Sequence, residues 1–429
     1  MFLFLRHSAA AESPVEPVQN SERTGIAAAG GIRFATLTMD GIGIPHVEGR
    51  LADGSFIILG SRPMTKKGDD GIQWRSVVSV RSVDGGQTWS SGGVILPPQD
   101  MGIDMGDGAM LFDAATQVFF YVYRFNDPSR PYYSIRVKQS RTAGETWSDH
   151  SIVHEVTPPK GRKTGLWTPR LMFTPSGRLQ CYYDDGDLPE EVLGGTNSGQ
   201  WAVMRTWDGQ SRKWVDQVVV CRPPEGEKGP LRIAADGART PMTFGDGFIW
   251  SPAESPIMNP NQEAPGGPRS LSLRFALSTD DGRTWSWSRG SWPALSSPPL
   301  LHENGSYFNW SWPLGAKLGD GSVLVLFRSD EPLAGEMTRN ADGTVKSAKV
   351  PSRGTSHQVD KRLHYLFTTA DEATWRSKMG EVEWAKGMVS SEFIIDHDIV
   401  PLHDGAALIG FNTRQDPKRH IIMRATRSP

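Results

Sequence analysis

The stretch Ser82-Val83-Asp84-Gly85-Gly86-Gln87-Thr88-Trp89 recurs in full as Ser278-Thr279-Asp280-Asp281-Gly282-Arg283-Thr284-Trp285. Weaker copies run over residues 140–147 and 368–375, and a faint one covers residues 206–209, with Trp214 beyond it. Asp-Gly and Gly-Gly pairs allow the positive φ angles of a tight turn, and Ser, Thr and Asp side chains bond the turn backbone. Each copy therefore predicts a tight hairpin whose apolar side is covered by the Trp.

A second repeat precedes the hairpins and consists of an apolar strand, a glycine-type turn and another apolar strand. Six copies are present, at residues 50–57, 110–121, 171–179, 242–249, 317–324 and 402–409. Two such strands followed by a hairpin make a four-stranded sheet, and six sheets around a channel are the natural count. The last repeat runs out of chain, so we expect residues 34–39 to supply its outermost strand and close the ring.

The hairpin repeat is the Asp-box pattern, and the chain resembles the sialidase-type superfamily. This resemblance implies an all-β fold, namely a six-bladed β-propeller with four-stranded antiparallel blades. No long stretch carries apolar residues at helical spacing, which agrees with an all-β class. We predict a propeller over residues 32–429, preceded by a loose tail over residues 1–31 that is rich in Ser, Glu, Pro, Gly and Ala.

The composition excludes several classes of partner. The chain has 429 residues and a formal net charge of −2, so no strong field attracts nucleic acid or an anionic membrane surface. No run reaches the ~18 apolar residues of a membrane span. Cys181 and Cys221 form no disulfide framework, and no spacing indicates a metal or another cofactor.

The N-terminus leaves the localisation open. Its apolar core, residues 1–5, is too short for a secretory signal, although Ala9-Ala10-Ala11 resembles the small residues near a cleavage site. The protein is expected to be cytoplasmic, or secreted if this segment is a remnant signal peptide. The oligomeric state is not predicted.

Geometry selects the candidate site. In such a blade the first strand begins, and the second strand ends, at the same mouth of the ring. Polar or ionisable side chains occupy these positions in every repeat, which favours recognition of a polar, sugar-like ligand. They include His46, Arg62, Asp104, Asp107, Arg124, Trp167, Arg170, Asp184, Arg239, Glu254, Trp310, Arg328, Asp396, His397, Asp398 and Arg414.

The sialidase motifs are matched only in part. The first blade of a sialidase begins with Arg-Ile-Pro, whereas this chain has Gly43-Ile44-Pro45 and lacks that carboxylate-clamping Arg. Arg62 resembles the Arg-Pro arginine after the second strand, and Arg274 resembles a second clamp arginine. The following loop carries the general-acid Asp of the family, which Asp69 or Asp70 resembles.

Two further sialidase positions differ. The nucleophilic Tyr of the family falls near Asp396 and His397, where no Tyr is present, and its assisting Glu falls near Arg239. Segments 166–172, 180–185 and 239–241 are instead similar to the third and fourth blades of exo-arabinanases. That family has a catalytic Glu where Thr168 falls and a second carboxylate near Glu254.

These residues support three hypotheses. The first is a glycoside hydrolase for a non-sialic glycan end, furanose or uronic-acid-containing, because hydrolysis needs an acid and a second carboxylate. Asp69 or Asp70 is the expected acid, and Glu254 or Asp396 is the expected second group. The residues expected to hold the carbohydrate are His46, Arg62, Asp104, Trp167, Arg170, Asp184, Arg239, Arg274 and Trp310.

The second hypothesis is a polysaccharide lyase that uses His46, His397 or Tyr183 as a base and an Arg to neutralise a uronate. The third is a propeller that binds glycans without catalysis, because several catalytic groups of the family are missing.

Overall fold

The computed structural model describes residues 26–27, 31–67, 73–159, 164–189, 200–221, 240–257, 270–287, 309–331, 337–339, 345–348, 361–377 and 382–427. Most of the predicted N-terminal tail lies outside these ranges. Within that predicted tail, β1 (Ile26–Ala27) pairs with β2 (Ile32–Gly41).

Four sheets contain four antiparallel strands each, in chain order. The first sheet is β3 (Ile44–Arg50), β4 (Phe56–Lys67), β5 (Gln73–Ser82) and β6 (Ser90–Asp100). The second is β7 (Ala109–Asp113), β8 (Val118–Asp127), β9 (Tyr132–Ser140) and β10 (Ser148–Val156). The third is β11 (Leu166–Phe173), β12 (Leu179–Asp185), β13 (Trp201–Asp208) and β14 (Lys213–Cys221). The fourth is β15 (Met242–Thr243), β16 (Ile249–Ile257), β17 (Ser270–Ser278) and β18 (Ser286–Trp287).

An eight-stranded sheet completes the ring, in the order β1-β2-β26-β25-β24-β23-β20-β19. Its remaining members are β19 (Trp310–Lys317), β20 (Val323–Ser329), β23 (Arg362–Thr368), β24 (Ala385–Pro401), β25 (Ala407–Thr413) and β26 (His420–Arg427). The long strand β24 pairs with β23 through its first half and with β25 through its second half. Because β2 pairs with β26, a strand from the start of the chain lies against its last strand.

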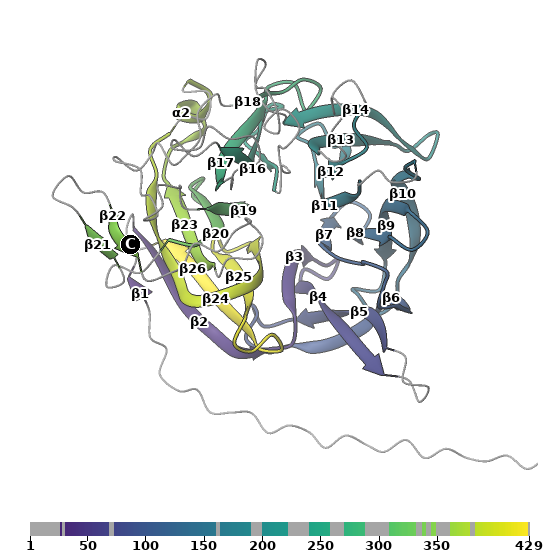
Figure 1. The fold of residues 1–429 in the computed structure, drawn as a ribbon, viewed down its shortest axis with the longest axis horizontal. Coiled ribbons are helices and arrows are strands. Elements are labelled where there is room, and N and C mark those ends of the chain that lie inside the picture. Colours follow the sequence, from purple (N-terminus) through teal and green to yellow (C-terminus); the bar gives the residue numbers. More distant parts are fainter. Residues whose placement is uncertain are drawn as a thin grey trace, which may run out of the picture.

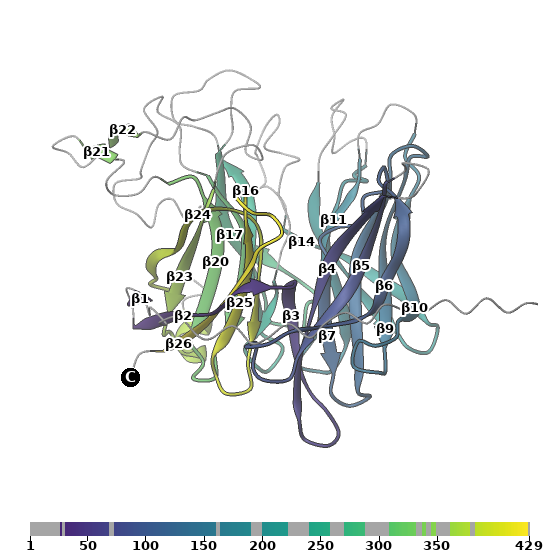
Figure 2. The same cartoon turned by 90° about the horizontal axis from the view of Figure 1, so that it is seen from below.

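The sheets are arranged around a central axis, as in a β-propeller, with β3, β7, β11 and β19 on the inner side (Figure 1). Viewed from the side, the strands run from one face of the ring to the other (Figure 2). Apolar side chains of neighbouring sheets pack together, for example Leu171, Cys181 and Tyr183 of the third sheet with residues of the second. A small separate pair, β21 (Met337–Arg339) and β22 (Val345–Ala348), lies outside the ring.

Hydrogen bonds hold the turn between β5 and β6. Asp84 accepts bonds from the backbone N–H of Thr88 at 2.9 Å and from its hydroxyl at 2.6 Å. Ser82 Oγ accepts the N–H of Gly86 at 2.9 Å, and Gly86 has a φ of 90°. The Trp89 indole donates to the Gly86 carbonyl at 3.1 Å. The side-chain bonds expected for this turn are therefore present.

The other copies follow the turn to different degrees. Between β17 and β18, Asp280 accepts the Thr284 N–H at 2.9 Å, and Trp285 donates to the Gly282 carbonyl at 3.1 Å. The hairpin predicted over residues 368–375 is wrong, because the helix α2 (Glu372–Ser377) forms there. Trp375 is nevertheless fully buried and donates to the carbonyl of Ala370 at 3.1 Å.

Two features of the chain bear on the expectations from composition. Cys181 and Cys221 are buried free thiols in the third sheet. In the part of the chain that the structure describes, no helix is long and apolar enough to cross a membrane.

Candidate functional site

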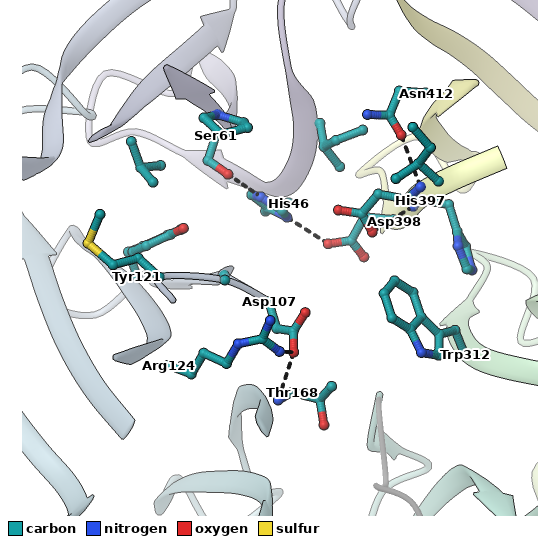
Figure 3. A pocket seen from close by; sticks show the side chains of 18 of the residues that line it. His46, Ser61, Asp107, Tyr121, Arg124, Thr168, Trp312, His397, Asp398 and Asn412 are labelled. Carbon is teal, nitrogen blue, oxygen red and sulfur yellow. Dashed lines mark hydrogen bonds and ion pairs between the residues drawn. The ribbon is translucent and has the colours of Figure 1, made fainter. Parts of the chain in front are cut away.

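A hollow of about 380 Å³ opens at one mouth of the ring, within the size range of about 300–1,000 Å³ that is typical of small-molecule sites. Side chains from most of the sheets meet in it (Figure 3). The described residues that line it are Ile44, His46, Ser61, Pro63, Arg75, Val77, Asp104, Met105, Gly106, Asp107, Gly108, Tyr121, Arg124, Thr168, Arg170, Trp312, Leu314, Ile395, Asp396, His397, Asp398 and Asn412.

Irregularities in the inner strands aim side chains into the hollow. The register of β3 shifts between Pro45 and Val47, which brackets His46. The register of β19 shifts between Ser311 and Leu314, and Trp312 within that bulge has a φ of 55°. A bulge breaks the alternation of a strand and redirects a side chain, so these departures belong to the construction of the site.

Arg124 joins two carboxylates on the wall formed by the second sheet. Its Nε lies 2.9 Å from Asp104 Oδ2, and its Nη1 bonds Asp107 Oδ2. Burial opposes the charge on Arg124, but the two aspartates outweigh it and raise its pKa above the ordinary value. Asp107 Oδ2 also accepts the backbone N–H of Thr168 at 3.2 Å, so its carboxylate is held by groups from two sheets.

His46 links the first strand of the first sheet to β24. Its Nδ1 lies 2.6 Å from Asp398 Oδ2, and its Nε2 lies 2.7 Å from Ser61 Oγ. Arg170 Nη2 lies 3.7 Å from the same Asp398 oxygen. Burial opposes ionisation of Asp398, but Arg170 and the hydrogen bond from His46 outweigh it, so the pKa of Asp398 falls below its ordinary value.

Asp396, two residues before Asp398, has a pKa that is shifted in the opposite direction. Burial against the walls of the hollow disfavours the charged form of Asp396 and raises its pKa. The negative charge of Asp107 raises this pKa further, whereas the positive charge of Arg328 lowers it. The side chain is accessible from the hollow. Asp396 is fixed in place because its N–H donates to Asn412 Oδ1 at 2.9 Å.

Tyr121 and Trp312 add aromatic surface. Tyr121 is 3% exposed, and burial raises the pKa of its phenol well above the ordinary value, so the hydroxyl keeps its proton. The guanidinium of Arg328 lies 3.4 Å from the centroid of the Trp312 ring and covers one face of it. Arg75 also lines the hollow, and its Nε has no hydrogen-bond acceptor among the described residues.

A second cavity of about 430 Å³ adjoins the hollow and is lined by residues of the inner strands. Both cavities are lined by His46, Arg170 and Asp398. The three residues therefore lie where the two cavities adjoin, and this part of the lining is the floor of the hollow.

The structure brings some of the predicted site residues together and places others elsewhere. His46, Asp104, Arg170, Asp396 and His397 line the hollow. Asp69, Asp70 and Arg239 lie outside the described residues. The predicted residues that are described but do not line the hollow are Arg62, Trp167, Asp184, Glu254, Arg274 and Trp310.

Strand alternation explains the place of Arg62. Ser61 and Pro63 line the hollow, so the side chain between them points to the other face of β4. There Arg62 Nη2 lies 3.4 Å from Ser91 Oγ of β6.

The two predicted stacking tryptophans are packing residues. Trp310 is 3% exposed and packs against Phe327, and its indole donates to Glu331 Oε1 at 2.6 Å. The ring of Trp167 lies against the backbone of Gly165 and Gly186, where a Cβ atom would fall within 3 Å of it.

Three further predicted residues are buried and do not line the hollow. Glu254 is fully buried and accepts the backbone N–H of Trp312 at 2.6 Å, so it supports the bulge that carries this ring. Asp184 accepts the hydroxyl of Thr168. Arg274 is 8% exposed and lies opposite Ala253 in the sheet.

Sequence reasoning missed Tyr121, Arg75 and Trp312, and it gave no role to Asp107, Arg124 or Asp398 although they stood at the expected mouth. Tyr121 belongs to the apolar run of β8, which is typical of core. Trp312 depends on a backbone bulge that no residue pattern announces.

The backbone around Gly43 leaves no room for the arginine that a sialidase has at this position. A Cβ atom at Gly43 would lie 2.7 Å from the carbonyl oxygen of Ser61 and 2.8 Å from a methyl group of Val80. No side chain fits there without movement of the backbone, so the carboxylate clamp of a sialidase is not built at this position. Among the described residues, no group of three or more His, Cys, Asp or Glu side chains is placed to hold a metal ion.

Comparison of structures finds glycoside hydrolases with the same fold. An α-L-arabinofuranosidase of Fusarium graminearum, solved as a mutant with an iminosugar inhibitor, is 15% identical, covers 91% of this chain and 98% of its own, and has a TM-score of 0.57. An α-L-arabinanase of Penicillium chrysogenum, solved with arabinobiose, is 14% identical, covers 94% and 98%, and has a TM-score of 0.54. A Hadza microbial sialidase is 14% identical and covers 90% of this chain and 65% of its own, with a TM-score of 0.47.

The chain thus has the propeller fold of the arabinofuranosidase and the arabinanase. No protein-family model matches the sequence, and no curated protein matches it.

Proposed function

We propose that the protein is a glycoside hydrolase that cleaves a non-sialic glycan end in the hollow. The observation that carries this proposal is the meeting of Asp396 and Asp107, two carboxyl groups with different surroundings. Asp396 has a raised pKa, to which the charge of Asp107 contributes, whereas Asp107 is paired with Arg124. Hydrolysis of a glycosidic bond requires one carboxyl group that holds a proton and one that is ionised.

Each carboxyl group then has a role. Asp396 donates its proton to the leaving oxygen as the glycosidic bond breaks. Asp107, paired with Arg124 and bonded by the Thr168 N–H, acts on the other side of the sugar as nucleophile or as the base that activates water. The anomeric configuration of the first product distinguishes these two roles of Asp107.

The remaining lining residues hold the sugar. Trp312 offers an indole face beside Asp396, although Arg328 already covers one side of the ring. Arg75 can donate to sugar hydroxyls or to a uronate carboxylate. The arabinobiose bound to the similar arabinanase supports a furanose substrate, and the arginines support a uronic-acid-containing one.

The proposal includes the blade count. The four four-stranded sheets are four blades, and the eight-stranded sheet is two blades that share β24. The pairing of β2 with β26 supports one propeller domain over residues 32–429 and ring closure by the N-terminal strand. Asp69, Asp70 and Arg239 follow or precede strands of this ring and remain predicted contributors to the site.

A panel of aryl glycosides and uronic-acid polymers tests the function, with the wild type compared with single variants. We expect Asp396→Asn and Asp107→Asn each to lower kcat by about 10²–10⁴-fold. Glu254→Gln is expected to raise KM through Trp312, and Asp69→Asn and Asp70→Asn test the predicted acid. Full activity in both Asp396→Asn and Asp107→Asn would end the assignment of these roles.

A polysaccharide lyase is the second candidate, and the position of His46 favours it. Its imidazole lines the hollow between Asp398 and Ser61, with Arg170 nearby, as a base beside a uronate would require. Tyr183, the predicted alternative base, is buried in the core and bonded by Arg205. A lyase yields an unsaturated product that absorbs in the near ultraviolet, whereas hydrolysis yields none.

Binding of a glycan without turnover of any panel member would instead indicate a non-catalytic propeller.

A further inference from the structure

We propose that Ser61, His46 and Asp398 form a nucleophilic triad that hydrolyses short-chain carboxylic esters in the floor of the same hollow. This activity goes beyond glycoside cleavage and uses a different set of residues. The triad is assembled from β3, β4 and β24, so the topology of the ring brings together side chains that are 352 positions apart at the extremes.

The distances match the requirements of such a triad. Ser61 Oγ lies 2.7 Å from His46 Nε2, within reach for proton transfer to the ring. The other ring nitrogen, Nδ1, lies 2.6 Å from Asp398 Oδ2. With the proton on Nδ1 donated to the carboxylate, Nε2 accepts the hydroxyl proton of Ser61, which is the tautomer that general-base catalysis needs.

The surroundings favour the bond between His46 and an ionised Asp398. His46 and Asp398 have side chains that are 6% and 8% exposed, so little water competes for their hydrogen bond. Arg170 stands 3.7 Å from Asp398 Oδ2 and stabilises its ionised form. The lowered pKa of Asp398 is consistent with a carboxylate that orients an imidazole and stays ionised.

Tyr121 and Arg170 are placed to stabilise an oxyanion. The Tyr121 hydroxyl interacts with Ser61 and keeps its proton because burial raises its pKa, so it can donate a hydrogen bond to negative charge that develops beside Ser61. Gly108 makes room for this hydroxyl, since a Cβ atom there would lie 1.9 Å from it. Arg170 carries a positive charge on the same side of the hollow.

The size and polarity of the floor define the substrate class. Ser61 is neighboured by apolar lining side chains from Ile44, Pro63 and Val77. They suit a small acyl group such as acetyl, while the polar upper part of the hollow suits the alcohol half of the ester, for example a sugar hydroxyl.

The reaction is balanced with water as its co-reactant. Ser61 Oγ bonds the ester carbonyl carbon while its proton moves to His46 Nε2. The bond from that carbon to the alcohol oxygen then breaks, and His46 returns the proton to the departing alcohol. Water attacks the acyl-Ser61 ester, again with proton transfer to His46, and releases the carboxylic acid and free Ser61.

The experiment measures hydrolysis of p-nitrophenyl acetate by the full chain and the labelling of Ser61. We expect wild-type protein treated with a fluorophosphonate to carry the label on the peptide that contains Ser61. We expect Ser61→Ala to lose at least about 100-fold in kcat/KM, and the exposed control Ser91→Ala to retain the wild-type rate.

Two results would overturn the triad. One is ester hydrolysis in Ser61→Ala at the wild-type rate. The other is folded wild-type protein that hydrolyses no p-nitrophenyl ester and takes no label on Ser61. The labelling experiment needs no substitution, so poor folding of a variant does not obscure it, and neither result bears on glycoside cleavage.

Discussion

Asp396 and Asp398 lie two residues apart on β24, and the hollow shifts their pKa values in opposite directions. The walls and the charge of Asp107 raise the pKa of Asp396, whereas Arg170 and His46 more than offset burial and lower that of Asp398. The carboxyl group of Asp396 therefore holds its proton more readily than an ordinary aspartate, and that of Asp398 less readily. Such a separation of pKa values is how enzymes assign acid and base roles to chemically identical groups.

The pH profile of glycoside cleavage should respond to Arg328. Activity that requires protonated Asp396 is lost as pH rises through the pKa of Asp396. Because Arg328 lowers that pKa, Arg328→Gln should raise it and move the basic limb of kcat/KM upward by roughly one pH unit. The matched control Arg283→Gln, on an exposed turn, should leave the limb in place. A shift to lower pH in Arg328→Gln would contradict the assignment.

Asp398 should stabilise the fold at neutral pH and lose this effect in acid. Its folded pKa is lowered, so its contribution is present above the unfolded value, about 3.9, and is lost as pH falls through the folded value. Asp398→Asn should lower the free energy of unfolding at pH 7 by about 3–5 kcal/mol, because it disrupts a buried ion pair.

Denaturant unfolding at pH 7 and near pH 3 measures this effect. The difference between wild type and Asp398→Asn should narrow at the lower pH. Asp404→Asn, which removes the partner of Arg424 at the surface, should cost less than about 1 kcal/mol at pH 7. Equal losses in the two variants would show that the floor of the hollow is not a buried ion-pair site.

Two nearby tryptophans should have different roles. Trp312→Ala should weaken substrate binding by about tenfold with little change in thermal stability, because its ring lines the hollow. Trp310→Ala should lower the free energy of unfolding by about 3–5 kcal/mol, because its ring is buried in the core. Thermal melting and KM of both variants check this, and reversed phenotypes would refute the placement of the bulge.

The hairpin turns should contribute to stability and not to chemistry. Asp84→Ala removes the acceptor for Thr88 N–H and its hydroxyl, so we expect a loss of about 1–2 kcal/mol with unchanged kcat. Val83→Ser, in the same turn at a side chain that is 76% exposed, is the control and should be neutral. A large loss of kcat in folded Asp84→Ala would place catalysis near this turn.

The repeats predicted the strands and the mouth, because turn residues and strand ends can be read from sequence. His46, Arg170 and Asp396 stand at such strand ends, and all three line the hollow. The repeat does not show which side chains of β4 face the hollow, and it is Ser61 and Pro63, not the predicted Arg62, that line it.

Other residues depended on features that no local pattern reveals. The bulge in β19 places Trp312 at the hollow in place of the predicted Trp310, and the distant Glu254 supports this bulge. The ring of Tyr121 is buried in the core, as its apolar neighbours in the sequence suggest, but the residue also lines the hollow. The repeats therefore predict the sheets, whereas the composition of the site depends on tertiary contacts between sheets.

Leaving-group dependence in Asp396→Asn tests the central claim most directly. The rates of wild type and variant are compared on two glycosides of the best panel sugar, one with an alkyl and one with a dinitrophenyl leaving group. If Asp396 is the acid, the variant loses at least about 100-fold on the alkyl glycoside and only a few-fold on the dinitrophenyl glycoside, which departs without protonation. Equal losses on both substrates, or no loss on either, would contradict the account.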